Sequence, residues 1–382
     1  MPLTRRKFLL GSLPLTLVGC TTHDAFRIAQ GVAGGGSIED VVVSRAQSKA
    51  RSWVTNPQSL VNDIKRVDSF LTHISSAWGG DDSVKPSPKE YVKYTDGYTS
   101  RALVDFETGI VRVESQNKQL LKQSIIKTLL TPANPEKVDL FSDQEVVLGD
   151  EPFLFNQIVD QDHKPIRWAW RADRYAAYLL NQGVHTRQIK MPDGSQKSVS
   201  YVEFPLLQQH KLTRQHKYAS YVERYAAKYQ LAPALVYAII ETESNFNPYA
   251  VSWVPAYGLM QIVPTTAGRD AFEEVHGYAG TPSASYLFNI ENNIRMGCAY
   301  LHILQTRYLV KVRNPVSKEY CVIAAYNGGA GNVLRSFSSQ REEAFNIINR
   351  SSSEHVWSSL RTKMPVESQG YLVKVTSAKK RY

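Results

Sequence analysis

The chain has 382 residues, of which 43% are hydrophobic, so it is long enough for two or three packed domains with a sizeable buried core. Its 45 Lys and Arg residues against 35 Asp and Glu residues give a formal charge of +10. This excess favours anionic partners, which include nucleic acid, phospholipid surfaces and carboxylate-bearing polymers. Three cysteines are too few for a disulfide framework, and no apolar stretch is long enough for a transmembrane helix.

The first twenty residues predict an export signal. The basic residues 5–7 precede a short apolar run, residues 8–18, which is typical of a secretory signal rather than a spanning helix. Residues 17–20 (Leu-Val-Gly-Cys) resemble the lipobox of bacterial lipoproteins, in which the cysteine is acylated and becomes the mature N-terminus. The resemblance predicts a signal peptide at residues 1–20 and lipidation at Cys20; the alternative is a chance cysteine after a signal.

The export route and the destination depend on short patterns. Residues 4–9 (Thr-Arg-Arg-Lys-Phe-Leu) are similar to a twin-arginine signal, although an ordinary basic signal explains the same string. The residue after Cys20 is Thr21 rather than Asp. In lipoproteins, the absence of Asp at this position implies sorting to the outer membrane, with the protein facing the periplasm. Residues 21–44 contain a glycine run and predict a flexible tether. A phosphate-binding loop is disfavoured because no Gly-Lys-Ser/Thr follows the glycines.

Residues 45–204 predict an α+β domain. Apolar residues recur at helical spacing from Leu60 to Ile74 and stop at Gly79 and Gly80. Two β-hairpins and two helices follow in alternation. The expected strands are residues 102–106, 110–114, 188–191 and 199–204, and the expected helices are residues 117–130 and 170–181.

The first half contains no catalytic pattern, such as a metal-binding His-Glu-x-x-His or a Gly-x-Ser-x-Gly nucleophile motif. A basic and aromatic cluster is its most distinctive feature. This cluster either stacks on sugars or nucleic acid, or is the edge of an amphipathic helix. Its members are Arg167, Trp168, Trp170, Arg171 and Arg174. The sequence leaves two roles open for this domain, which are ligand binding and positioning.

Residues 205–382 predict a mainly α-helical domain, because helices with short breaks replace the strand pattern after Pro205. Aromatic residues from Tyr218 to Tyr229 form one apolar stripe, and Pro233 suits the first position of the next helix. Cys298 and Cys321 are expected to be buried apolar thiols.

The helix that begins near Pro233 carries a carboxyl group on its apolar face. At about 100° per residue, Glu243 falls within about 60° of Val236, Ile239 and Ile240, so it continues the buried face. Glu241 points about 160° away from Glu243 and is expected to be a solvated surface residue. A carboxyl desolvated in this way favours its neutral form and can act as a proton donor near neutral pH. The alternative is a glutamate that only happens to lie near a helix end.

Three sequence blocks support the catalytic interpretation. The first runs Glu243-Ser-Asn-Phe-Asn-Pro and continues through Ala250, Ser252, the Gly-Leu-Met-Gln of residues 258–261 and the Pro-Thr-Thr-Ala of residues 264–267. The second is Ala-Tyr-Asn-Gly-Gly at residues 325–329 with Gly331, and the third contains Glu367, Tyr371 and Val373. Together they closely resemble the goose-lysozyme-like domain of soluble-type lytic transglycosylases, over roughly residues 215–376.

The resemblance implies a lysozyme-like fold and a role for each matching residue. Glu243 matches the catalytic acid and base, and Tyr326 matches the tyrosine that holds its carboxyl group. Ser252 matches a contact to the N-acetyl group, Gln261 matches a contact to the sugar, and Asn327 and Glu367 line the groove. Each residue other than Glu243 has a structural alternative. Thr242 replaces a common Gln, and the apolar residues 253–255 leave the shape of the groove rim open.

The implied reaction is cleavage of the bond between N-acetylmuramic acid (MurNAc) and N-acetylglucosamine (GlcNAc) in peptidoglycan, with formation of a 1,6-anhydro ring. A two-carboxylate hydrolase needs a second Asp or Glu, and residues 244–269 contain none. The expected partners are peptidoglycan and, through acyl chains, a membrane, with no metal or cofactor. The alternatives are a muramidase-like hydrolase that uses water and a non-catalytic wall-binding lipoprotein. Nucleic acid is disfavoured because no recognition motif accompanies the charge.

Overall fold

The computed structural model describes residues 57–252 and 256–382, with side chains from residue 65 onward. The predicted signal peptide, Cys20 and the tether lie outside the described residues, as does the loop of residues 253–255. Among the described helices, none combines the length and the apolar character needed to cross a membrane.

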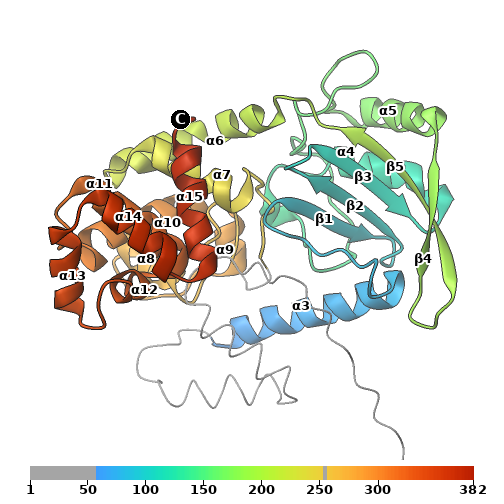
Figure 1. Cartoon of the computed structure of the whole chain (residues 1–382). Helices are drawn as coiled ribbons and strands as arrows, with labels where there is room; N and C mark the ends of the chain where they lie inside the picture. Colours follow the sequence, from blue (N-terminus) through green and yellow to red (C-terminus); the bar gives the residue numbers. More distant parts are fainter. Residues whose placement is uncertain (1–56, 253–255) are drawn as a thin grey trace, which may run out of the picture.

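The N-terminal half is one long helix followed by a five-stranded antiparallel sheet with the order β1-β2-β3-β5-β4 (Figure 1). The helix α3 (Pro57–Trp78) ends at the glycine pair, as predicted. The strands are β1 (Glu90–Thr95), β2 (Ser100–Asp105), β3 (Ile110–Ser115), β4 (His185–Lys190) and β5 (Gln196–Pro205). Both predicted hairpins are confirmed, because β2 pairs with β3 and β4 pairs with β5.

Helices cover both faces of the sheet. Phe70, Ile74 and Trp78 of α3 pack against one face. The opposite face, which includes Val104 and Val113, packs against α4 (Leu121–Leu129) and α5 (Ala169–Gln182), the two helices predicted between the hairpins. The alternation of side chains along each strand allows two separate apolar layers. The α+β prediction for this half is therefore correct.

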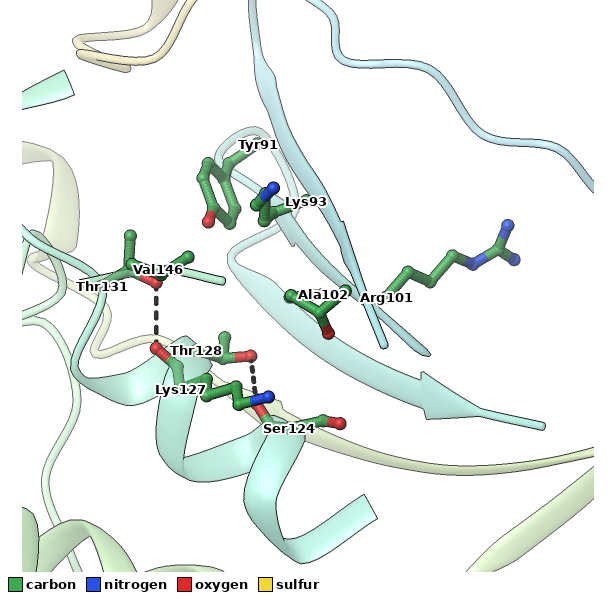
Figure 2. A pocket seen from close by; sticks show the side chains of 10 residues that line it. Tyr91, Lys93, Arg101, Ala102, Ser124, Lys127, Thr128, Thr131 and Val146 are labelled. Carbon is green, nitrogen blue, oxygen red and sulfur yellow. Dashed lines mark hydrogen bonds between the residues drawn. The ribbon is translucent and has the colours of Figure 1, made fainter. Parts of the chain in front are cut away.

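The strand β1 was not predicted, because a lysine interrupts its apolar pattern. Lys93 is nevertheless only 2% exposed, and its ammonium group donates to the carbonyl oxygens of Asp139 and Ser142, each at 2.8 Å. Figure 2 shows Lys93 beside Tyr91 in a small pocket between the sheet and α4. Burial lowers the pKa of Lys93 to about 8, and nearby carboxylates, foremost Asp139, oppose this shift. Hydrogen bonds to the backbone carbonyls of a distant loop thus offset the desolvation cost of burying this lysine in a strand.

The C-terminal half is helical. Its longer helices are α6 (His210–Lys228), α7 (Pro233–Ser244), α8 (Ala267–His276), α10 (Ile290–Ile303), α11 (Pro315–Gly328), α13 (Arg341–Arg350), α14 (Ser353–Lys363) and α15 (Val366–Lys379). The short helices α9 (Ala284–Phe288) and α12 (Ala330–Arg335) lie between them. Cys298 and Cys321 are fully buried and are not in a disulfide, as predicted.

The two halves share a continuous hydrophobic core, which extends from the α4 side of the sheet into the helices. β5 ends at Pro205 and α6 begins at His210, next to the boundary predicted near residue 205. The division into two domains stays a prediction, because the buried residues show no break there.

Arg214 of α6 joins the two halves. It is 1% exposed, and its guanidinium donates to the side-chain oxygen of Gln157 at 2.6 Å and to the carbonyl of Asn245 at 3.1 Å. The same group lies 4.3 Å from the ring centroid of Phe106, which follows β2. One buried side chain therefore contacts a loop, a strand end and the end of α7.

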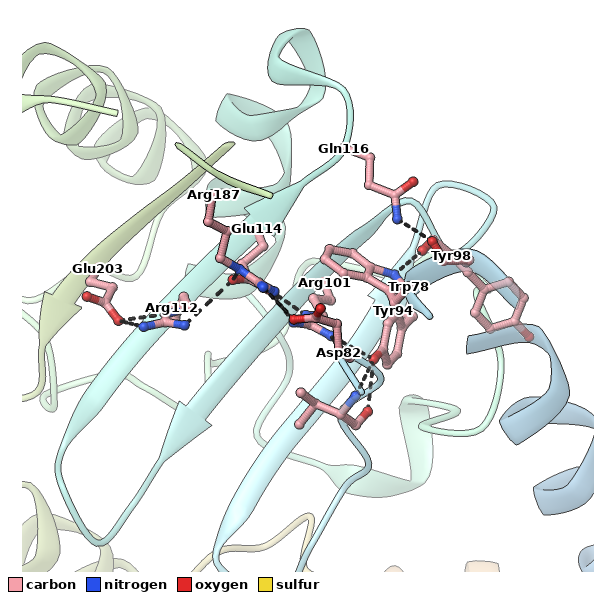
Figure 3. A network of polar contacts seen from close by, with 12 residues as sticks. Trp78, Asp82, Tyr94, Tyr98, Arg101, Arg112, Glu114, Gln116, Arg187 and Glu203 are labelled. Atoms are coloured by element: carbon pink, nitrogen blue, oxygen red, sulfur yellow. Dashed lines mark hydrogen bonds and ion pairs between the residues drawn. The ribbon is translucent and has the colours of Figure 1, made fainter. Parts of the chain in front are cut away.

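A network of charged groups crosses the α3 side of the sheet (Figure 3). Glu114 is fully buried at its centre and accepts from Arg101 at 2.6 Å and from Arg187 at 3.0 Å. The Arg101 guanidinium also lies 3.9 Å from the Trp78 ring centroid. At the rim of the network, Arg112 pairs with Glu203 at 2.5 Å, and both of these side chains are 39% exposed.

Removal of the central carboxylate should destabilise the sheet strongly. Glu114→Ala leaves Arg101 buried without its counter-ion, so we expect a loss of about 3–5 kcal/mol in the free energy of unfolding. Glu203→Ala removes only an exposed partner and should cost less than about 1 kcal/mol. Urea unfolding of both variants measures the difference, and equal losses would contradict the central role of Glu114.

Candidate active site

Helix α7 presents the candidate acid at the end of an almost entirely buried helix. Pro233 occupies the first turn, and every residue from Leu235 to Ile240 is buried. Glu243 is 4% exposed, in agreement with its predicted place on the apolar face. The apolar side chains along most of α7 allow neighbouring helices to pack around it, so the carboxyl group leaves bulk water.

Glu241 was predicted to be a solvated surface residue, and this prediction was wrong. Its side chain is only 13% exposed and forms ion pairs with Lys211 and Arg381, and it also accepts from the Tyr382 hydroxyl at 2.6 Å. Burial disfavours its charge, but hydrogen bonds from Lys211, Tyr382 and Arg381 outweigh that effect and lower its pKa. The C-terminal residues of the chain reach this side of α7, and helical periodicity within α7 does not reveal them.

Two asparagines attach the end of α7 to the N-terminal half. Asn245 ends the helix in the left-handed region, with φ of 48°, and its amide donates to the carbonyl of Phe106 at 2.5 Å. The Asn247 amide donates to the carbonyl of Pro88 at 3.1 Å. Phe246 between them also has a positive φ of 61°. Strand ends of the sheet therefore hold the strained turn directly after Glu243.

The environment of Glu243 favours the protonated carboxyl group. Burial raises its pKa to about 8, and the negative charge of Glu367 acts in the same direction. A hydrogen bond with the Tyr371 hydroxyl and the positive charge of Lys89 oppose the shift. The Oε2 atom of Glu243 is buried and has no hydrogen-bond partner among the described residues. The Oε2 atom thus keeps unused hydrogen-bonding capacity inside a buried site.

The structure brings the three sequence blocks together. The Ser244 hydroxyl, next to Glu243, donates to the carbonyl of Leu259 at 2.8 Å. The Tyr326 hydroxyl donates to the carbonyl of Met260 at 2.8 Å, which joins the first block to the second. The Ser368 hydroxyl then donates to the side-chain oxygen of Asn327 at 2.7 Å, which joins the second block to the third.

Two glycines of these blocks are needed for close packing. Gly258 has φ of +72°, and a Cβ atom there would lie 2.4 Å from the Asn293 amide nitrogen. A Cβ atom at Gly328 would lie 2.4 Å from the Ser368 hydroxyl oxygen, so α11 and α15 can approach only because this residue is glycine.

The predicted groove residues lie around these contacts. Gln261 is 7% exposed with φ of 47°, and its amide donates to the carbonyl of Gly258 at 3.0 Å. The Gln261 Oε1 atom and the Asn327 Nδ2 atom are buried and have no partner among the described residues. The Ser252 hydroxyl accepts from the Ala256 amide at 3.1 Å, at the two ends of the undescribed loop. Glu367 is half-buried near Glu243.

Two features of the site differ from the sequence predictions. The Tyr371 hydroxyl of the third block, to which no role was assigned, acts on the Glu243 carboxyl and lowers its pKa. The Tyr326 hydroxyl donates to the carbonyl of Met260, and its predicted role at the Glu243 carboxyl stays a prediction. Glu367 also places a second carboxylate close enough to change the pKa of Glu243, although it lies far outside residues 244–269. Contacts between distant blocks decide both points.

No group of three or more His, Cys, Asp or Glu side chains suited to a metal ion occurs in the described part of the chain. An open pocket lies between α8, α10 and α12, and its lining includes Tyr300, Arg269, Thr266 and Gly331.

The mainly helical half carries a buried glutamate at a helix end, and two further sequence blocks pack around it. These features are those of the lytic transglycosylase class of proteins. Residues 220–349 match the model of the transglycosylase SLT domain. Residues 53–248 match the model of the N-terminal domain of membrane-bound lytic murein transglycosylase C, so the two matches overlap across α7. This protein belongs to the membrane-bound lytic murein transglycosylase C family.

The relatives of that name support the assignment along most of the chain. Those from Yersinia pestis (strain Pestoides F) and Yersinia pseudotuberculosis serotype O:1b (strain IP 31758) are each 44% identical over 319 residues, which cover 82% of this chain and 87% of theirs.

Two solved structures are similar to a part of the chain. They are an inactive mutant of the lytic transglycosylase Slt from Pseudomonas aeruginosa, 26% identical with a TM-score of 0.32, and the 70 kDa soluble lytic transglycosylase from Escherichia coli, 28% identical with a TM-score of 0.34. Each match covers 42% of this chain but only 23% of the solved one, and the TM-scores are too low to establish a shared overall fold.

The raised pKa of Glu243 predicts a pH-dependent cost to stability. The folded chain keeps this proton up to about pH 8, whereas an unfolded glutamate releases it near 4.5, so folding becomes less favourable as the pH rises through this window. Glu243→Gln cannot ionise. Its advantage in stability over the parent should therefore be near zero at pH 4.5 and grow toward pH 8, with an upper limit of about 5 kcal/mol. Thermal unfolding across this pH range measures the difference, and a constant difference would contradict the assignment.

Proposed function

We propose that this protein is an enzyme that cleaves the glycan strands of peptidoglycan by lytic transglycosylation, for remodelling and turnover of the cell wall. It acts on the β-1,4 bond between MurNAc and GlcNAc and leaves 1,6-anhydro-MurNAc ends. The observation that carries the proposal is the buried Glu243 carboxyl, which has a pKa of about 8 and one oxygen without a protein partner. The names of the relatives, which are lytic murein transglycosylases, support the same reaction.

The first step is proton donation by Glu243. Below about pH 8 its carboxyl is mostly protonated, and it donates the proton to the glycosidic oxygen while the bond from the glycosidic oxygen to C1 of MurNAc breaks. Positive charge then develops at C1, and the neighbouring N-acetyl group stabilises it. The carboxylate left on Glu243 is stabilised by the Tyr371 hydroxyl and the charge of Lys89.

The second step closes the ring. The C6 hydroxyl of the same MurNAc attacks C1 and gives its proton to the Glu243 carboxylate, which restores the acid for the next cycle. The reaction consumes no water, and every bond change is accounted for by one residue that acts first as acid and then as base.

The groove residues hold the sugars on either side of the scissile bond. Gln261 and Asn327 each have a buried polar atom without a partner among the described residues, which suits hydrogen bonds to sugar hydroxyl or N-acetyl groups. Ser252 contacts the N-acetyl group and Glu367 lines the groove, as the resemblance implies. The resemblance assigns Tyr326 to the Glu243 carboxyl, and the Tyr326 hydroxyl donates to the carbonyl of Met260.

One observation favours a second candidate, a hydrolase. Glu367 lies close enough to raise the pKa of Glu243, and a second carboxylate at a suitable distance can activate water or act as nucleophile. The products separate the two reactions, because hydrolysis leaves a reducing end.

The chain acts at the membrane, as the family name indicates. We infer that acyl chains on Cys20 anchor it to the outer membrane, facing the periplasm, and that residues 21–44 are the tether. More than one acyl chain is needed for a stable anchor, which a lipoprotein cysteine supplies. The basic composition suits a site between anionic lipids and the carboxylates of peptide stems.

Products released from purified peptidoglycan test the reaction. We expect the protein without residues 1–20 to release muropeptides that are about 18 Da lighter than hydrolytic products, because ring closure replaces the addition of water. Glu243→Gln should release none. Mass spectrometry of both digests measures this, and reducing-end products would establish the hydrolase.

The pH dependence of lytic activity tests the role of Tyr371. Activity should fall as the pH rises through about 8, because the acid loses its proton there. Tyr371→Phe removes a hydrogen bond that lowers the pKa, so the alkaline limb should move to higher pH while the maximal rate falls about tenfold or more. Tyr326→Phe should leave the limb in place. A shift with Tyr326→Phe instead would assign Tyr326 to the carboxyl.

A further inference from the structure

Two tryptophans on the N-terminal half are exposed to solvent. Trp168 precedes the first residue of α5 and Trp170 lies in its first turn, and each is 58% exposed. The helix α5 covers the face of the sheet opposite α3, as Figure 1 shows. Large aromatic residues are usually buried, so an exposed pair at one helix end indicates a binding surface.

A buried carboxylate holds these residues in place. The side chain of Asp160 is fully buried, and its Oδ1 atom accepts from the backbone amides of Asp162 and Lys164, each at 3.0 Å. Its Oδ2 atom pairs with Arg171 and Arg174 of α5. The loop before α5 and the first turns of the helix are therefore tied to one point, which lowers the entropy cost of binding at this surface.

Arginines lie over both indole rings. The Arg167 guanidinium is 5.2 Å from the Trp168 ring centroid, and the Arg171 guanidinium is 4.5 Å from the Trp170 ring centroid. Each contact orients its ring and leaves more than half of the residue exposed. Each ring is thus held in place while a large apolar area faces solvent.

Most of the charges around the tryptophans are paired. Arg171 pairs with Asp160, Arg174 pairs with Asp162, and Lys122 pairs with Asp173 at 2.7 Å. Within residues 57–252 and 256–382, Arg167 and Lys164 have no carboxylate partner. An anionic lipid surface or a nucleic acid calls for a larger unbalanced positive charge. A ligand that binds mainly through apolar faces fits this surface better.

We propose that Trp168 and Trp170 form a second glycan-binding surface, which holds a peptidoglycan strand away from the catalytic groove. The proposal rests on the proposed function, since it takes the same polymer as ligand. Sugar rings present apolar C–H faces that stack on indoles, and their hydroxyl edges remain in contact with water. Arg167 is placed to pair with a carboxylate of a peptide stem. Such a surface would keep the enzyme on an insoluble substrate between cleavage events.

Retention on intact peptidoglycan tests the proposal. The full chain in detergent carries Glu243→Gln to prevent digestion, and its co-sedimentation with purified peptidoglycan sacculi is measured with and without Trp168→Ala and Trp170→Ala. We expect the double substitution to weaken binding about fivefold to tenfold, with little dependence on salt. Val147→Ala, which changes another exposed apolar residue of the same half, should bind as the parent does.

Activity measurements separate this proposal from the proposed function. In the chain with Glu243 intact, the tryptophan substitutions should slow digestion of sacculi but leave the rate on a short soluble muropeptide oligomer unchanged. Absence of lytic activity in the parent would contradict the proposed function alone. Unchanged binding to sacculi after both substitutions would overturn the second surface.

Binding to lipid vesicles tests whether this surface contacts a membrane instead of a glycan strand. The Cys20→Ser chain is offered vesicles of phosphatidylethanolamine and phosphatidylglycerol, so that no acyl anchor contributes. The glycan surface predicts equal and weak binding with and without the two tryptophans. If the substitutions reduce vesicle binding and spare sacculus binding, the surface contacts lipid and the proposal is wrong.

Discussion

The burial of one carboxyl group is the constraint on which the site depends. Glu243 lies in the last turn of α7, a helix that is buried on most sides, and the helix dipole at this C-terminal end also disfavours negative charge. Desolvation keeps its proton at neutral pH, and Tyr371 and Lys89 prevent the pKa from rising further. An acid that must later act as a base requires this balance, because a carboxyl that never ionises could not take the second proton.

The N-terminal half takes part in building this environment. Lys89 contributes charge, while the carbonyls of Pro88 and Phe106 hold the turn after Glu243 through Asn247 and Asn245. Arg214 adds a buried link between the same turn and the Gln157 loop. The sheet and the helical half therefore act as one unit around the carboxyl group, although the sequence predicts two domains of different secondary structure.

Much of the local structure could be predicted because it depends on neighbours in the chain. Both hairpins, the helices that flank them and the start of α7 at Pro233 follow from short-range patterns of turn and apolar residues. The strand β1 could not be predicted, since Lys93 is buried only with the help of carbonyls from residues 139 and 142. Glu241 was misjudged for a similar reason, because Arg381 and Tyr382 come from the far end of the chain.

The sequence by itself determined the α+β class, the family blocks and the place of Glu243 on the apolar face of its helix, because periodicity and motif spacing are local properties. Only the tertiary structure decided which groups surround that carboxyl. Tyr371 and Glu367 from the third block and Lys89 from the N-terminal half act on it, and none is close to it in sequence. Electrostatic effects depend on distance in space and on burial, and the packing of distant segments sets both.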